Sequence, residues 1–321
     1  MIEYILLNLL LFVYVILISI EFGNSIYYYI FSKLDVNISK IIFRYISPVW
    51  ELTNTFLVLF IVFLVALYPK APLIYGTVFL IPASIALFFF LLRSFSFVYI
   101  FEFDESSILF KTLYGVSSFF IPMFLVLYFS VSIFNNFKVI GNTVIYSLHS
   151  VIFSPLSIAF MGFAILNILY ISAAFLLIYT KEDKKIIPEL SNIFIILSLI
   201  MMFFVSLMFY IFRSLHFFSV ILNHYFLIIF VYIIFFALSQ MFIVFKEYKY
   251  LFLLVLFQMF LLFLIYIIGN FPYILYNNIS IYNLNNSVTV KYLLYSVILA
   301  IIFIVPSLIF FIYFLKKKKN V

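Results

Sequence analysis

The chain has 321 residues, of which 68% are hydrophobic and only 9% are charged, and its formal net charge at pH 7 is +7. Soluble domains are about half apolar and about a quarter charged, so this composition excludes a soluble protein and indicates a polytopic membrane protein. The chain contains no cysteine, which excludes disulfides, thiolate metal sites, iron–sulfur clusters and thiol nucleophiles.

Nine apolar segments follow one another along the chain. Each meets or approaches the ~20 residues that a helix needs to cross the ~30 Å hydrocarbon core of a bilayer. The segments are continuously apolar and do not alternate, which favours a helical bundle over an outer-membrane barrel. We therefore predict an all-α membrane protein with nine transmembrane helices, at roughly 4–22, 49–68, 73–100, 113–134, 156–179, 186–212, 218–245, 249–269 and 292–315.

The longest connector between the first eight predicted helices covers residues 135–154 and is rich in Asn, Ser and Gly. It divides the chain into a first four-helix bundle, residues 1–134, and a second one, residues 155–269. Residues 270–321 then contribute an outer loop, the peripheral ninth helix and a lysine tail.

Basic residues are unevenly distributed between the two sides of the predicted bundle. Thirteen of them, including the run Lys316–Lys319, fall on one side, and four fall on the other. Basic loops stay in the cytoplasm, so we predict a multi-pass protein of the cell membrane with its N-terminus outside and its C-terminus inside. The positive charge thus reflects membrane topology and does not indicate a nucleic-acid site.

Three charged residues lie within the predicted spans or at their ends. Glu21 ends the first helix and Glu51 begins the second, both on the predicted inner side, and Arg93 precedes the inner end of the third. An ionisable group near the centre of a membrane helix costs about 2.5–3.5 kcal/mol, so such groups face the bundle interior and pair. We expect these three residues to lie close together in the inner leaflet.

Polar stripes on the first two predicted helices support this expectation. On the second helix the stripe is formed at i, i+4, i+7 and i+8 by Ser47, Glu51, Asn54 and Thr55. A shorter stripe on the first helix is formed by Glu21, Asn24 and Ser25. The residues that follow Thr55 in this helix are apolar, so the pattern predicts a hydrated path that enters from the cytoplasm and ends partway into the membrane.

The sequence leaves two interpretations of these charges open. In the first, Glu21 and Glu51 relay protons inward beside Arg93. In the second, the three residues form an ion-pair network that fixes helix register and carries no protons.

The three histidines are poor candidates for ligands. His149, His216 and His224 fall in predicted outer loops or at an outer helix end, and none is paired at i, i+4 with another His or a carboxylate. We therefore expect no metal site and no haem bound by this chain alone.

The segment "SPVWELTNTF" at residues 47–56 resembles part of subunit II of cytochrome bd-type quinol oxidases. In that family, proline, valine and tryptophan are followed by aspartate at the start of the second helix. Pro48, Val49 and Trp50 match this motif, and Glu51 occupies the aspartate position.

Three other places are similar to the same family. The first helix ends in "IEFGNS", with Glu21 at a family aspartate, and Arg93 in "FLLRSFSF" lies where the third helix of the family carries an arginine. The outer loop "GNFPYIL" resembles the family through Phe271, Pro272 and Tyr273. Two acidic residues of the family are replaced here by Asn54 and Val98, which reduces a carboxylate proton route to Glu21 and Glu51.

The resemblance implies a heterodimeric oxidase of the respiratory chain that passes electrons from quinol to oxygen. A haem-bearing subunit I with the same fold would hold haem b, haem d and the quinol site. This chain would act as scaffold, contribute Glu21, Glu51 and Arg93 to a cytoplasmic proton path, and offer room for an oxygen route or a structural quinone. A small accessory subunit is a further partner that the resemblance allows.

Two alternatives to this function were weighed. An ion- or proton-coupled transporter would use the same charges, but it predicts inverted repeats and glycine-broken helices near the midplane. The chain has only six glycines, and its charges lie near the inner interface, so this alternative is disfavoured. The other alternative is a purely structural oxidase subunit, which the sequence does not separate from a proton-conducting one.

Overall fold

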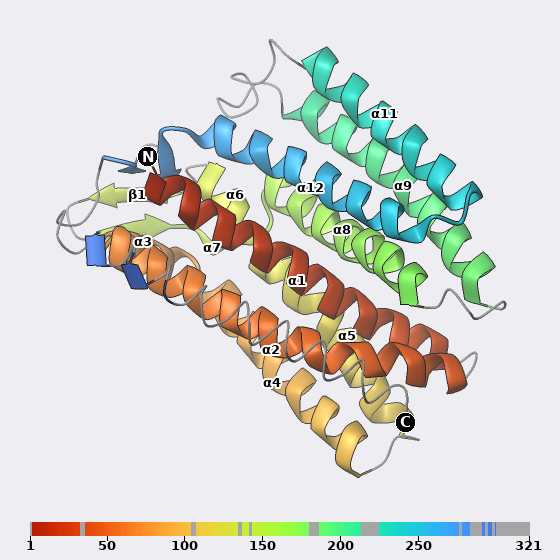
Figure 1. Cartoon of the computed structure of the whole chain (residues 1–321). Helices are drawn as coiled ribbons and strands as arrows, with labels where there is room; N and C mark the ends of the chain where they lie inside the picture. The colour runs from red at the N-terminus through yellow and green to blue at the C-terminus, as the bar shows by residue number, and fades with distance from the viewer. Residues whose placement is uncertain are drawn as a thin grey trace.

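The computed structural model describes most of the chain as a bundle of long helices (Figure 1). Six helices within the described part are long and apolar enough to cross a membrane, and two shorter apolar helices lie at Leu52–Leu67 and Ile234–Val244. The predicted all-α membrane fold is therefore confirmed, whereas the count of nine stays a prediction. The described residues are 2–32, 36–103, 107–133, 137–140, 143–179, 186–212, 225–275, 278–282, 291–292, 295–296 and 299.

The helices of the first predicted bundle differ in length from the apolar segments that predict them. Two of them are interrupted, because the predicted span 73–100 is split at Phe79 and the predicted span 113–134 is split at Val126. In order, the helices are α1 (Ile2–Ser32), α2 (Val36–Leu67), α3 (Ala71–Val78), α4 (Leu80–Glu102), α5 (Ile108–Leu125) and α6 (Leu127–Ile133).

The second bundle agrees more closely with the predicted segments. Helices α8 and α12 lie beside α1, and α9 and α11 lie farther from it (Figure 1). Beyond the short α7 (Leu148–Ile152), the helices are α8 (Pro155–Tyr179), α9 (Ile186–Ile211), α11 (Tyr225–Val244) and α12 (Tyr248–Asn270). Most of the predicted ninth helix, 292–315, lies outside the described residues.

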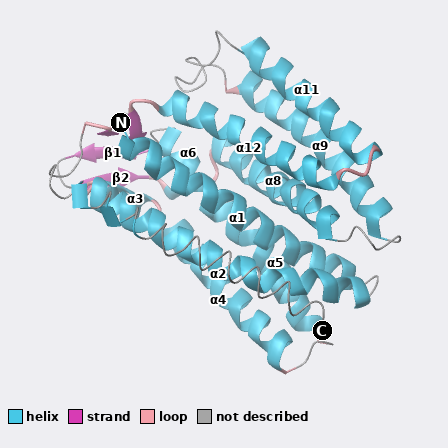
Figure 2. Ribbon diagram, viewed as in Figure 1, coloured by secondary structure: helices cyan, strands magenta, loops and turns pink. Residues whose placement is uncertain are grey.

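Two short hairpins connect helices at the end of the molecule that holds the N-terminus (Figure 2). In the first, Phe137 lies opposite Tyr146 and Ile140 opposite Thr143. The predicted connector 135–154 is thus a hairpin followed by α7, and the loop after α12 forms the second hairpin. The paired strands are β1 (Phe137–Ile140) with β2 (Thr143–Tyr146) and β3 (Tyr273–Leu275) with β4 (Ile279–Ser280).

Two glycines let α1 approach its neighbours closely. A Cβ atom at Gly23 would lie 2.0 Å from Ser172 Oγ on α8, and one at Gly115 of α5 would lie 2.6 Å from Tyr29 Cβ on α1. Separations of this size are not compatible with any side chain, so glycine is required at both crossings. As a result α1 is held firmly between α5 and α8, and its polar residues are buried against them.

Candidate functional site

A buried ion pair joins the first and fourth helices. Arg93 on α4 and Glu21 on α1 are both almost completely buried, and Arg93 Nη1 lies 2.6 Å from Glu21 Oε1. The pair lies nearer to the end of the bundle at which α1 runs into α2, residues 33–35, which we name the inner end. The sequence predicts that this end faces the cytoplasm.

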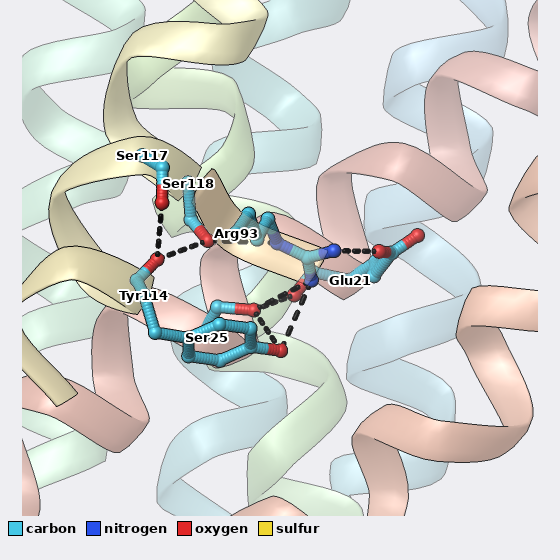
Figure 3. A network of polar contacts seen from close by, with 6 residues as sticks. All are labelled: Glu21, Ser25, Arg93, Tyr114, Ser117 and Ser118. Carbon is cyan, nitrogen blue, oxygen red and sulfur yellow. Dashed lines mark hydrogen bonds and ion pairs between the residues drawn. The ribbon is translucent and has the colours of Figure 1, made fainter. Parts of the chain in front are cut away.

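The remaining donors of Arg93 are satisfied by hydroxyl groups (Figure 3). Its Nε donates to Ser118 Oγ at 2.9 Å, and its Nη2 donates to Ser25 Oγ at 3.0 Å and to Tyr114 Oη at 3.1 Å. The guanidinium carbon lies 4.6 Å from the ring centroid of Phe22 and 4.9 Å from that of Tyr114. Groups from α1 and α5 therefore surround the cation on α4, as a buried charge requires.

Two members of this network were missed by the sequence analysis. Tyr114 and Ser118 lie four residues apart on α5, in a segment that reads as an ordinary apolar span. Their spacing places both hydroxyls on one helical face, and that is the only signal in the sequence. A serine or tyrosine in a membrane helix does not reveal its partner until the helices are packed.

A second cation lies closer to the inner end. Lys111 precedes the predicted span 113–134, which puts it in a predicted inner loop, but the structure places it in the first turn of α5, where the side chain is buried. Its Nζ lies 5.9 Å from the ring centroid of Tyr28 on α1. The correction arises because α5 begins at Ile108, five residues before the predicted apolar span.

The predicted stripe on α2 is described only in part. Its helical backbone is described, but the side chains of Ser47, Pro48, Val49 and Glu51 lie outside the described residues. Asn54 is half-buried and Thr55 is exposed, so these two side chains face different surroundings. Trp50 is partly exposed, and its ring lies 6.2 Å from that of Phe97 on α4.

A large apolar cavity begins where this stripe ends. Its volume is about 870 Å³, and its lining comes mainly from α1, α2, α4, α5, α8, α9 and α12. The few polar lining residues toward the inner end are Tyr14, Ser19, Asn54 and Asn167. Glu51 lies three residues before Asn54, or about 4.5 Å of helix rise toward the inner end.

The cavity reaches the surface of the chain between α2 and α4. Its lining includes Ile61 and Val65 of α2 and Leu80 and Leu87 of α4, and all four side chains are exposed. In a membrane these residues would face lipid or a partner subunit. The mouth therefore admits apolar molecules from the bilayer more readily than ions from water.

The outer-loop motif lies at the opposite end from the ion pair. Phe271, Pro272 and Tyr273 directly follow α12, and Phe271 lies edge-on to Tyr4 of α1 with ring centroids 6.2 Å apart. The backbone N–H of Ile281 donates to Pro272 O at 2.9 Å. These contacts tie the second hairpin to the bundle and bring none of the motif near Glu21.

No set of three or more His, Cys, Asp or Glu side chains in the described part of the chain could hold a metal ion. His149 is exposed on α7, and His216 and His224 lie outside the described residues. The expectation that haem is held by a partner stays a prediction. The described lining of the cavity is apolar apart from a few tyrosine, serine and amide side chains.

Comparisons with known proteins agree on one family. Residues 1–315 match the family model described as cytochrome bd terminal oxidase subunit II. The chain is 30% identical over 175 residues to a Bacillus subtilis (strain 168) protein named as a cytochrome bd menaquinol oxidase subunit II, which covers 54% of this chain and 50% of that protein. The chain thus spans about half the length of this curated relative.

A solved structure extends the likeness to nearly the whole chain. The bd oxidase from Geobacillus thermodenitrificans contains a chain that superposes with a TM-score of 0.82 at 27% sequence identity. The match covers 97% of this chain and 98% of that one. The similarity therefore includes both bundles and the middle of the sequence, where motifs are scarce.

Proposed function

The chain belongs to the cytochrome bd terminal oxidase subunit II family, and we propose that it is the non-haem subunit of a membrane-bound quinol:oxygen oxidoreductase. In this proposal, a haem-bearing subunit I holds haem b and haem d, carries the quinol site and forms a heterodimer with this chain. The likeness to a bd oxidase over 97% of the chain supports such an assembly. Family membership also speaks against the transporter alternative.

The buried Glu21–Arg93 pair is the observation that carries the proton path in this proposal. It brings a carboxylate, a guanidinium and hydroxyls from three helices together near the inner end. Glu21 is already paired with Arg93, so we assign the transferred proton to Glu51, which precedes the cavity residue Asn54 by one turn. Ser47 and Asn54 would line the same route on α2, whereas Thr55, which is exposed, would lie outside it.

The cavity supports a second role. An apolar space of about 870 Å³ that opens between α2 and α4 suits a neutral guest from the bilayer, either oxygen or a quinone that stays bound. A bound quinone would supply a carbonyl or hydroxyl head group, to which the hydroxyl of Tyr14 could donate a hydrogen bond. Oxygen would need no polar contact at all.

The variant Glu51→Gln tests the proton path in the purified oxidase complex. It keeps the size and hydrogen bonding of the side chain but removes the titrating group. We expect the complex to assemble while oxygen consumption falls by about tenfold or more and its pH profile changes. Glu51→Asp, the residue type of the family motif, should retain much of the activity.

The control is Glu102→Gln, because Glu102 is an exposed carboxylate at the end of α4. It should leave turnover unchanged. If Glu51→Gln assembles normally and turns over like the parent at every pH, Glu51 carries no protons. The subunit is then a structural one, which is the remaining alternative.

The orientation of the chain is part of the proposal, because the path must open to the cytoplasm. Cysteines introduced at Ser147 and Asn320 into this cysteine-free chain should react with membrane-impermeant thiol reagents from opposite sides. Reaction of both from the same side would contradict the predicted topology.

A further inference from the structure

Helix α1 carries a continuous buried polar face that the proposed path uses only at Glu21. Five residues at i, i+7, i+10, i+11 and i+14 fall within about 100° of the helix circumference: Tyr14, Glu21, Asn24, Ser25 and Tyr28. All five are buried, the most exposed of them being Tyr14 at 6%. The face runs from the inner end, where Tyr28 meets Lys111, to the cavity, which Tyr14 lines.

Several polar atoms on or beside this face lack a partner. Asn24 is completely buried, yet neither its Nδ2 nor its Oδ1 makes a hydrogen bond in the described structure. The buried hydroxyl of Tyr14 also makes no hydrogen bond in the described structure. The same is true of Oδ1 of Asn167, a residue of α8 that lines the cavity. Unsatisfied buried amides and hydroxyls are costly, and in native proteins they are bonded to protein groups or to ordered water.

The unpartnered atoms lie on either side of the ion pair. Asn24 is one turn from Glu21 toward the inner end, and Tyr14 is two turns from it toward the cavity. At the inner end, the ammonium of Lys111 lies 5.9 Å from the ring centroid of Tyr28 and offers three donors. Water is the small ligand that offers a donor and an acceptor at each of these places.

We propose that the polar face of α1 binds a file of water molecules, held by Asn24 and Tyr14, that passes the Glu21–Arg93 pair and joins the inner end to the cavity. Asn24 is then a positioning residue, because it orders water beside Glu21 and does not itself exchange a proton. The use of this file in proton delivery rests on the proposed function, but the presence of the water does not.

Cysteine reactivity tests for the water. Thiols react as thiolates, which form only in contact with water, so a cysteine on a wet face reacts faster than one in a dry core. Asn24→Cys should react with the small neutral reagent 2-hydroxyethyl methanethiosulfonate about tenfold or more faster than Ile26→Cys, measured by mass on this chain in the assembled complex. Ile26 is the matched control, because it is buried two residues away on the opposite face of α1.

Equal, slow reaction of the two cysteines would overturn the proposal. Because a cysteine variant can fail to assemble, a second pair of variants gives an independent answer. Asn24→Leu removes the amide while keeping the branching and the number of heavy atoms of the side chain, and Asn8→Leu makes the same change on α1 at a buried amide whose Nδ2 donates to Tyr4 O at 2.9 Å.

Asn24→Leu should assemble but lower oxygen consumption by about tenfold and change its pH profile, whereas Asn8→Leu should leave both unchanged. Asn24→Ser, which leaves room for water and a hydroxyl to bind it, should recover most of the rate. Unchanged turnover and pH profile in Asn24→Leu would overturn the role in proton delivery. If position 24 is labelled fast and Glu51→Gln leaves turnover unchanged, the water file is kept and the proposed function is refuted instead.

Discussion

The two ends of the cavity satisfy buried polar groups by different chemistry. Near the inner end, Arg93 and Glu21 form an ion pair within a network of hydroxyls. At the opposite end, the described lining is neutral: Tyr75 Oη lies 2.7 Å from Ser132 Oγ, and the ring of Tyr75 stacks on that of Tyr128 with centroids 4.9 Å apart.

This difference separates what each end can do. A buried charge needs several partners at once, and Arg93 draws them from two neighbouring helices, α1 and α5, whereas a neutral hydroxyl is satisfied by one neighbour. A carboxylate carries a charge near neutral pH that a partner must balance, whereas a tyrosine or serine hydroxyl is neutral there. The proposed proton path therefore belongs to the inner end, whereas neutral hydroxyl groups line the described part of the opposite end.

The strongest test of this comparison removes the buried cation. Arg93→Met should leave Glu21 buried without its partner, which costs about 3–5 kcal/mol, so the yield of assembled complex should fall sharply. Adding Glu21→Gln should restore much of that yield, because no uncompensated charge then remains. The yield is measured by size-exclusion chromatography of the haem-containing complex.

The matched control for Arg93→Met is Lys70→Met, which removes an exposed cation just before α3. It should assemble like the parent. If Arg93→Met alone assembled equally well, the ion pair would contribute little to the stability of the inner end.

A pair of tyrosine variants compares the two ends directly. Tyr114→Phe removes an acceptor from the Arg93 guanidinium and should destabilise the complex by about 1.5–3 kcal/mol, the range for hydrogen bonds to charged groups. Tyr75→Phe should cost only about 1 kcal/mol, because Ser132 Oγ still donates to Tyr128 O. Unfolding of both complexes by denaturant measures the difference, and equal losses would remove the distinction between the ends.

The smallest effect on stability is expected at the cavity. A Cβ atom at Gly76 of α3 would meet nothing within 4 Å, although Gly76 lines the cavity. Gly76→Trp should therefore change stability by no more than about 1 kcal/mol while filling part of the cavity. If the cavity carries oxygen, the KM for oxygen should rise several-fold, and if it holds a quinone, the quinone that co-purifies should be lost.

Gly76→Ala serves as the control, because it adds a single methyl group and leaves the cavity open. It should behave like the parent in both measurements. No change in either measurement with the tryptophan variant would mean that the cavity carries neither guest.

Hydropathy located the long helices but not their ends. The first apolar segment stops at residue 22, yet α1 continues to Ser32, because Asn24 and Ser25 are buried by neighbouring helices that a single segment cannot reveal. The end of α1 is thus decided by packing. The split of the third predicted span at Phe79 does have a local signal, because Pro82 lies three residues later and its ring and missing N–H disfavour an uninterrupted helix there.

The sequence predicts the charged residues of the candidate site but not the hydroxyl groups that bind them. The cost of an isolated charge in the membrane indicates that Glu21 and Arg93 need partners, and their shared depth indicates that they lie near each other. Tyr114 and Ser118 carry no such cost at their places in the sequence, so only the packing of α5 against α1 and α4 identifies them. The same applies to the unpartnered amide of Asn24.

The ion pair also has a consequence for biosynthesis. Helix α1 is translated first, so Glu21 enters the bilayer about seventy residues before Arg93 leaves the ribosome, a delay of several seconds at about 5–20 residues per second. During that interval the carboxylate lacks Arg93, its partner in the folded chain, and the cost of holding it is lowest near the lipid head groups. Glu21 lies toward the inner end of α1, where a nascent helix can keep its carboxylate in contact with interfacial water until α4 arrives. This position would therefore be favoured by the order of insertion even in a subunit that moved no protons.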